Sequence, residues 1–104
     1  MRNIIINAIK NRQLLEFSYN GNLRIVEPHT FGVFSNGNEI LVTYQVDGTS
    51  DSGKVPDWRP FTFSKIQNLQ ILNNTFSGAR NGYKKGDSRF QTIYQDLWLK
   101  ELSK

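Results

Sequence analysis

The 104-residue chain contains no cysteine, which excludes disulfide bonds, thiolate nucleophiles and cysteine-ligated metal sites. It also lacks a long apolar run: the stretch Ile4 to Ile6 is far shorter than the roughly 20 residues that a membrane-spanning helix needs. No signal-peptide pattern opens the chain. We therefore expect a cytoplasmic protein that makes no contact with a membrane.

Sequence motifs of catalysis are missing as well. His29 is the only histidine, so the metal-binding spacings H-x-x-H and H-E-x-x-H do not occur. No Walker loop, Rossmann fingerprint, Ser-His-Asp order or close carboxylate pair is present. The sequence therefore predicts a protein that is not an enzyme and that has neither a metal site nor a cofactor.

The composition that remains is that of a small globular domain with an uneven charge. Hydrophobic residues make up 38% and aromatic residues 12%, enough for one modest core. The formal net charge is +4, yet residues 1–57 carry five Lys/Arg against six Asp/Glu, and residues 58–104 carry eight against three. A basic half indicates a polyanionic or phosphate-bearing partner, or equally a surface charge that keeps the protein soluble.

Apolar periodicity predicts one helix followed by short strands. Residues 2–12 place Ile5, Ala8 and Ile9 on one helical face. Residues 14–19 alternate between apolar and polar side chains, which is typical of a half-buried strand. Further strands are expected at 23–27, 31–34, 39–46, 59–63 and 69–72, with Asn-Gly turns at 20–21 and 36–37, a loop over 47–57, and Pro28 as the end of pairing for the second strand.

The C-terminal part is predicted to be a loop and a helix. Residues 77–88 are polar and rich in glycine. Ser88 and Gln91 then match a helix capping box. The apolar face of the expected helix consists of Phe90, Ile93, Tyr94 and Leu97, and is widened by Trp98.

These elements predict a mainly β fold with flanking helices, in the α+β class. Five or six short antiparallel strands would form a small barrel or a strongly bent sheet. We assign residues 1–76 to a β domain with its leading helix, and residues 77–104 to a basic loop and C-terminal helix packed on the same domain.

The hairpin turn at 20–21 brings two chemically useful side chains together. Tyr19 and Arg24 flank the turn, so a phenol and a guanidinium lie close on neighbouring strands. Arg59 occupies a later strand on the same side as Phe61 by parity. An arginine fixed on a strand is a preorganised fork for phosphate or carboxylate.

A purely structural role is the alternative for these residues. Arg24 and Arg59 would then pair across strands with Glu16 or Glu27, at about 0.2–1 kcal/mol for each pair. Tyr19 would stack on a base in the functional interpretation and pack in the core in the structural one.

The order of the features resembles the WYL domain over residues 4–76. The matching residues are Ala8-Ile9, Leu15-x-Phe17-x-Tyr19, Arg24-x-Val26-x-Pro28, Leu41-x-x-Tyr44, Arg59-x-Phe61 and Lys65-Ile66-x-x-Leu69. The triplet that names the family falls at Glu39-Ile40-Leu41 and keeps only its leucine, while the usual Asp-Arg-Ile reads Ser64-Lys65-Ile66. We expect a stand-alone domain without the usual helix-turn-helix.

The resemblance implies a small Sm-like, SH3-type barrel that acts as a regulatory ligand sensor, as in bacterial transcription regulators and defence-associated proteins. Its ligand would be nucleic acid or a nucleotide-like anion. By position the ligand-binding residues are Tyr19, Arg24, His29, Arg59 and Lys65. For His29, a hydrogen-bonded structural role is the alternative.

A second basic patch extends the expected footprint. It consists of Arg80, Lys84, Lys85 and Arg89, which would follow a phosphate backbone or form a solvated loop. The sequence thus predicts a regulatory module that binds single-stranded nucleic acid or a nucleotide. The alternative is a protein-interaction or oligomerisation module, in which an edge strand or the Trp98 face contacts a second copy of the chain or a regulatory protein.

Overall fold

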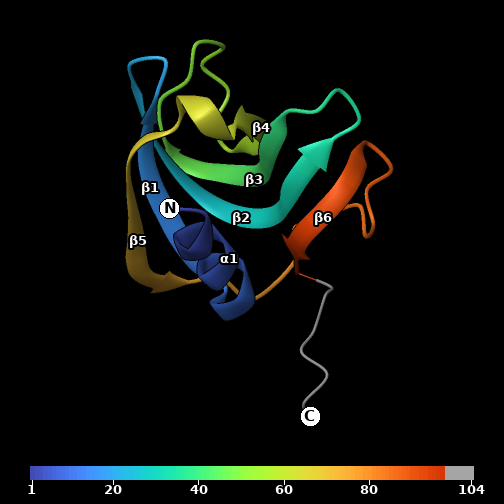
Figure 1. Cartoon of the computed structure of the whole chain (residues 1–104). Coiled ribbons are helices and arrows are strands. Elements are labelled where there is room, and N and C mark those ends of the chain that lie inside the picture. The colour runs from blue at the N-terminus through green and yellow to red at the C-terminus, as the bar shows by residue number, and fades with distance from the viewer. Residues whose placement is uncertain (98–104) are drawn as a thin grey trace.

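The predicted N-terminal helix and first hairpin are both present in the computed structural model, which describes residues 1–97 (Figure 1). Helix α1 spans Arg2–Asn11 and buries the expected apolar face; it ends because Arg12 adopts the left-handed conformation with φ of 54°. Strand β1 spans Gln13–Tyr19. Asn20 and Gly21 then have φ of 52° and 75°, as a tight hairpin turn requires.

The second strand is longer than expected. Strand β2 spans Asn22–Phe34 and pairs with β3, which spans Glu39–Gly48. The prediction that Pro28 ends the pairing is wrong, since Pro28 lies opposite Thr43 and the ladder resumes at Thr30. The register shifts between Pro28 and Thr30, so the missing N–H of the proline falls at a local irregularity rather than at a strand end.

The remaining elements complete one antiparallel sheet. They are β4 (Asp57–Thr62), the 3-10 turn η1 (Phe63–Lys65), β5 (Gln67–Thr75) and β6 (Phe90–Asp96). The strand order is β4-β3-β2-β1-β5, and β6 pairs with β2. The mainly β, antiparallel prediction is confirmed. The predicted barrel is wrong, because β4 and β5 are edge strands that do not pair with each other, so the sheet is not closed within residues 1–97.

The predicted C-terminal helix is also wrong, because residues 90–96 form strand β6. The pattern of Phe90, Ile93 and Tyr94 fits a helix, but tertiary pairing decides the outcome. Strand β1 pairs with β2 only as far as Val26, so the same edge of β2 is open beyond that point. Strand β6 fills this edge from Thr30 to Phe34. Trp98 lies outside the described residues.

A close approach of backbones fixes this last pairing. A Cβ atom at Gly32 would lie 2.1 Å from the carbonyl oxygen of Thr92 in β6. Only glycine allows the two strands to come this near. The segment that follows residue 76 therefore returns to the same sheet as the rest of the domain.

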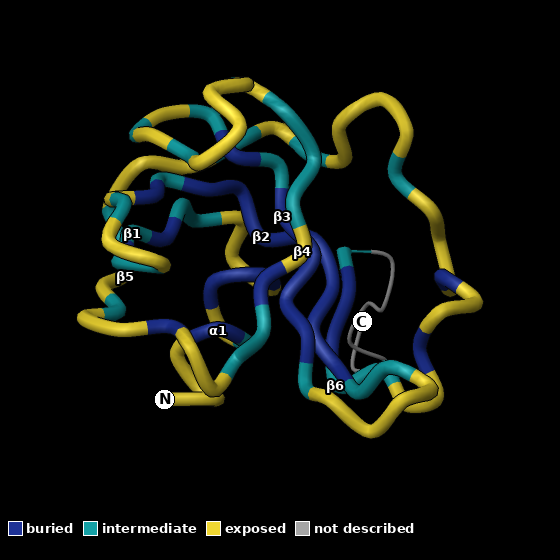
Figure 2. The backbone as a smooth tube through the Cα atoms, turned by 90° about the horizontal axis from the view of Figure 1, so that it is seen from above, coloured by how far each residue is buried: buried dark blue, intermediate teal, exposed yellow. Residues whose placement is uncertain are grey.

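The core lies between α1 and the bent sheet. Helix α1 packs on β1 and β2 and also touches β5 and β6 (Figure 1). Buried backbone runs along the central strands, while the connecting loops are exposed (Figure 2). The largest fully buried side chains include Phe17, Phe31 and Phe61. No helix within residues 1–97 has the length and apolar character needed to cross a membrane.

Candidate anion-binding site

Two of the predicted site residues, Tyr19 and Arg24, pack against the ring of Phe61, and the charge of a third, Arg59, acts on Arg24. Arg24 projects from β2 with its Cζ 5.3 Å from the Phe61 ring centroid, and Arg59 lies two residues before Phe61 on β4. The Tyr19 ring packs edge-on against Phe61 with ring centroids 4.8 Å apart. The hairpin and the sheet register therefore bring together residues that lie 40 positions apart in the sequence.

Arg24 is buried without a carboxylate partner. Only 4% of the residue is exposed. Its Nη1 donates to Oε1 of Gln45 at 3.2 Å, and its Nη2 donates to the carbonyl oxygen of Tyr19 at 3.2 Å. Its Nε has no hydrogen-bond partner. Burial lowers the pKa of the Arg24 guanidinium, and the nearby positive charge of Arg59 lowers it further.

Arg59 is half-buried and bonds to neutral oxygens of the loop that precedes β4. Its Nη2 donates to Oγ of Ser50 and to Oγ of Ser52, both at 3.0 Å, and to the carbonyl oxygen of Lys54. Its Nε is buried and also has no hydrogen-bond partner. The two arginines thus form a guanidinium pair, in which each member has one unsatisfied donor.

The expected structural alternative for the guanidinium pair does not occur in the described residues. Glu27 binds Arg80 instead, through Nε at 2.7 Å and Nη2 at 2.8 Å. No ion pair joins Glu16 to Arg24 or Arg59 within residues 1–97. The negative charge of Asp51 opposes the lowering of the Arg24 pKa, but its Oδ1 accepts a hydrogen bond from Asn22.

Tyr19 supports the guanidinium pair, and the Cζ of Arg24 lies 5.7 Å from the centroid of its ring. Its hydroxyl accepts a hydrogen bond from the backbone N–H of Thr62 at 3.1 Å, which ties β1 to the end of β4. Its backbone carbonyl holds Arg24. The arrangement favours a positioning role for Tyr19 over stacking on a base.

His29 lies in a different cluster and holds the segment after β5. It is fully buried, and its Nδ1 lies 2.8 Å from the carbonyl oxygen of Glu27, while its Nε2 accepts the backbone N–H of Arg80 at 3.1 Å. These partners require a neutral ring with the proton on Nδ1. Burial lowers the pKa of His29, which favours that neutral form.

The other predicted cations are placed apart from the guanidinium pair. Lys65 is exposed on η1. In the second basic patch, an ion pair ties Arg80 to Glu27 and another ties Arg89 to Asp87. Lys84 and Lys85 are exposed. The patch is therefore less positive than its sequence indicates.

Sequence reasoning missed the neutral side chains that hold the guanidinium pair. Gln45 is fully buried on β3 and fixes Arg24, while its Nε2 donates to the carbonyl oxygens of Asp47 and Thr49 at 3.0 Å. Ser50 and Ser52 lie in what reads only as a polar loop. The available signal was weak: a glutamine in the middle of an apolar strand needs buried partners.

Comparison of the chain with protein-family models, with curated proteins and with solved structures found no match. The resemblance to the WYL domain therefore rests on the residue pattern alone and stays a hypothesis. The geometry of the guanidinium pair is independent of that resemblance.

Proposed function

We propose that this protein is a regulatory ligand-binding module whose guanidinium pair, Arg24 and Arg59, binds an anion. The observation that carries the proposal is that the buried Arg24 and the half-buried Arg59 are neighbours without a carboxylate partner among residues 1–97, and that each keeps an unsatisfied Nε–H. An arrangement of this kind is unfavourable in the free protein, because a buried polar donor without a partner costs about 1–3 kcal/mol. An oxyanion between the two guanidinium groups would accept hydrogen bonds from both Nε–H groups and would offset the repulsion between the two positive charges.

The preferred ligand is a phosphate group of single-stranded nucleic acid or of a nucleotide. Arginine forks match the geometry of phosphate oxygens, and charge-assisted hydrogen bonds are roughly twice as strong as neutral ones. The WYL-like residue pattern points to the same ligand class. The net charge of +4 also favours a polyanion.

The loop at 49–54 takes part in this proposal as the group that the ligand displaces. Three of its oxygens already surround Nη2 of Arg59 in the free protein. Residues 51–54 are exposed, so the loop can move without opening the core. Phosphate oxygens would replace the hydroxyls of Ser50 and Ser52, and the ion would then reach both Nε atoms.

Fluorescence anisotropy of a short labelled single-stranded oligonucleotide, at two salt concentrations, tests the proposal. We expect saturable binding that weakens with salt, with a slope of about −0.7 for each phosphate neutralised. The variant Arg24→Met/Arg59→Met should raise the Kd by about 10- to 100-fold for each arginine removed, given about 1.5–3 kcal/mol for a hydrogen bond to a charged group.

Arg2→Met is the matched control, because it removes one exposed arginine that pairs with Glu39 outside the site. Equal affinity in the double methionine variant and the wild type would refute the site. Competition with a mononucleotide and with inorganic phosphate separates the nucleic acid from a small anion.

The edge of β5 supports the alternative, a protein-interaction module. Strand β5 ends the path of the sheet, and Ile71 on it is 41% exposed. Sedimentation equilibrium over a wide concentration range tests self-association. A dimer that Ile71→Lys converts to a monomer would favour this function. A wild-type protein that is monomeric at every concentration would exclude self-association.

A further inference from the structure

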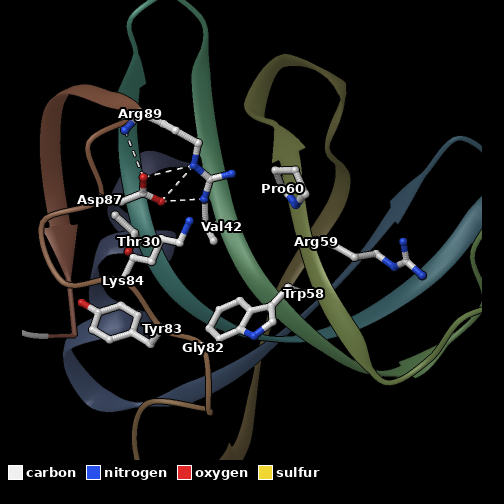
Figure 3. A pocket seen from close by; sticks show the side chains of 10 residues that line it. All are labelled: Thr30, Val42, Trp58, Arg59, Pro60, Gly82, Tyr83, Lys84, Asp87 and Arg89. Carbon is white, nitrogen blue, oxygen red and sulfur yellow. Dashed lines mark hydrogen bonds and ion pairs between the residues drawn. The ribbon is translucent and has the colours of Figure 1, made fainter.

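A pocket lies on the opposite face of β4 from the guanidinium pair. Successive side chains of a strand point to opposite faces, so Trp58 and Pro60 face this pocket while the Arg59 side chain points away from it (Figure 3). The volume is about 240 Å³. The lining residues come from β2, β3, β4 and the segment before β6: Thr30, Val42, Trp58, Arg59, Pro60, Gly82, Tyr83, Lys84, Asp87 and Arg89.

One end of the pocket is aromatic and rigid. The Trp58 indole is fixed because its Nε1 donates to the carbonyl oxygen of Asn81 at 2.9 Å and its ring packs on His29 with centroids 4.7 Å apart. A Cβ atom at Gly82 would lie 3.0 Å from Nε1 of Trp58, so glycine lets the segment lie against the indole. Figure 3 shows the rings of Trp58 and Tyr83 at this end.

The other end is charged and has an excess cation. Asp87 is buried, and its carboxylate accepts hydrogen bonds from Nε of Arg89 at 3.0 and 3.1 Å. Arg89 therefore balances Asp87, and the pKa of Asp87 is lowered chiefly by this bonding. The side chain of Lys84 points toward Asp87 (Figure 3), and its positive charge also lowers the pKa of Asp87, although no hydrogen bond or ion pair joins the two in the described part of the chain. Two cations therefore face one carboxylate, which leaves a net positive charge at this end of the pocket.

We propose that this pocket is a second binding site, for a planar ring that carries an anionic group. The ring would lie beside Trp58 and Tyr83, and the anion would lie at Lys84. A volume of about 240 Å³ is below the roughly 300–1,000 Å³ of pockets for drug-sized ligands, so one ring system with a single acidic group fits best. A nucleobase with its phosphate has this chemistry, either as a free mononucleotide or as one residue of a strand. The site goes beyond the guanidinium pair: Arg59 is one of its lining residues, but the guanidinium group of Arg59 points away from it (Figure 3).

Tryptophan fluorescence tests this site directly. The chain has two tryptophans, so Trp98→Phe leaves Trp58 as the only reporter. In this background we expect adenosine 5′-monophosphate or a single-stranded oligonucleotide to quench Trp58 in a saturable way. Lys84→Glu should raise the apparent Kd at least about tenfold, which corresponds to 1.4 kcal/mol. Lys85→Glu, a neighbouring lysine outside the pocket, is the matched control.

The variant Arg24→Met/Arg59→Met separates the two sites. Quenching that persists in this variant but weakens in Lys84→Glu would support the second site, even if the guanidinium pair binds nothing. Quenching that is lost in the double methionine variant and kept in Lys84→Glu would overturn it. No quenching by either probe would overturn it as well. Quenching by the mononucleotide identifies a free nucleotide as ligand, whereas quenching by the oligonucleotide alone identifies a base within a strand.

Discussion

Replacing Arg24 by methionine should leave the ligand-free protein almost as stable as the wild type. The change removes a buried charge, the repulsion from Arg59 and an unsatisfied Nε, which is worth about 1–3 kcal/mol by itself. It also removes the Arg24 donors from Oε1 of Gln45 and from the half-buried carbonyl oxygen of Tyr19, at a cost of about 1–3 kcal/mol, and removes a cation–π contact of about 0.5–2 kcal/mol. These opposing contributions nearly cancel, so we expect the free energy of unfolding to change by no more than about 1 kcal/mol.

Arg80→Met is the matched comparison, because Arg80 binds a carboxylate and Arg24 does not. Glu27 is 4% exposed, and loss of Arg80 would leave its charge buried and unpaired. We expect the free energy of unfolding to decrease by about 1–3 kcal/mol. This is less than for a fully buried pair, because the Arg80 side chain is 46% exposed. Urea unfolding followed by circular dichroism measures both variants.

The same pair of variants should respond differently to the ligand. A ligand at 100 times its Kd stabilises the wild type by about 2.7 kcal/mol, or roughly 10–20 °C in Tm for a domain of this size. Arg24→Met should lose most of this gain. If Arg24→Met instead destabilises the free protein as much as Arg80→Met does, Arg24 is a structural residue and the reasoning is refuted.

Three further outcomes are expected. Because the pKa of His29 is lowered in the folded state, the unfolded chain binds more protons as the pH falls. The free energy of unfolding should therefore be highest above about pH 6.5 and decrease below it, by at most about 1.4 kcal/mol per pH unit. Urea midpoints measured against pH check this, and His29→Gln should flatten the slope. Ser50→Ala/Ser52→Ala should lower the Kd for the anion several-fold, because the hydroxyls that compete for Arg59 are gone. An unchanged or higher Kd in fluorescence anisotropy would mean that the serines help to hold the ligand. Gly32→Ala should destabilise the fold by about 1–3 kcal/mol or more, since its Cβ would meet the β6 backbone at 2.1 Å; an unchanged urea midpoint would contradict the described pairing.

Local signals in the sequence were sufficient to predict the first helix and the first hairpin. The periodicity of residues 2–12 and the Asn20-Gly21 turn predicted α1 and the first hairpin, because both depend on residues close in sequence. The end of pairing at Pro28 was predicted wrongly, because a register shift on β2 absorbs the proline. The strand at 90–96 was missed since its partner edge exists only after β1 and β2 have paired.

The candidate site was predicted in part for the same reason. The hairpin predicted that Tyr19 and Arg24 lie close together, and strand parity placed Arg59 on the same side as Phe61. Only the resemblance to the WYL domain joined the three residues in one site. The sequence did not predict which carboxylate each arginine would bind: Glu27 lies three residues from Arg24 in sequence yet binds Arg80, 53 residues away. Long-range pairing of charges depends on the path of the segment after β5, which local patterns do not encode.

Nuclear magnetic resonance of the arginine Nε–H groups tests the guanidinium pair most directly. Single Arg→Met variants assign the signals, and a short single-stranded oligonucleotide is titrated into the wild type. The Nε–H signals of Arg24 and Arg59 should shift and become protected from exchange with water as the site fills. Those of Arg2 and Arg80, already bound to Glu39 and Glu27, should stay in place. Shifts at Arg2 and Arg80 with none at Arg24 and Arg59 would contradict the proposed site.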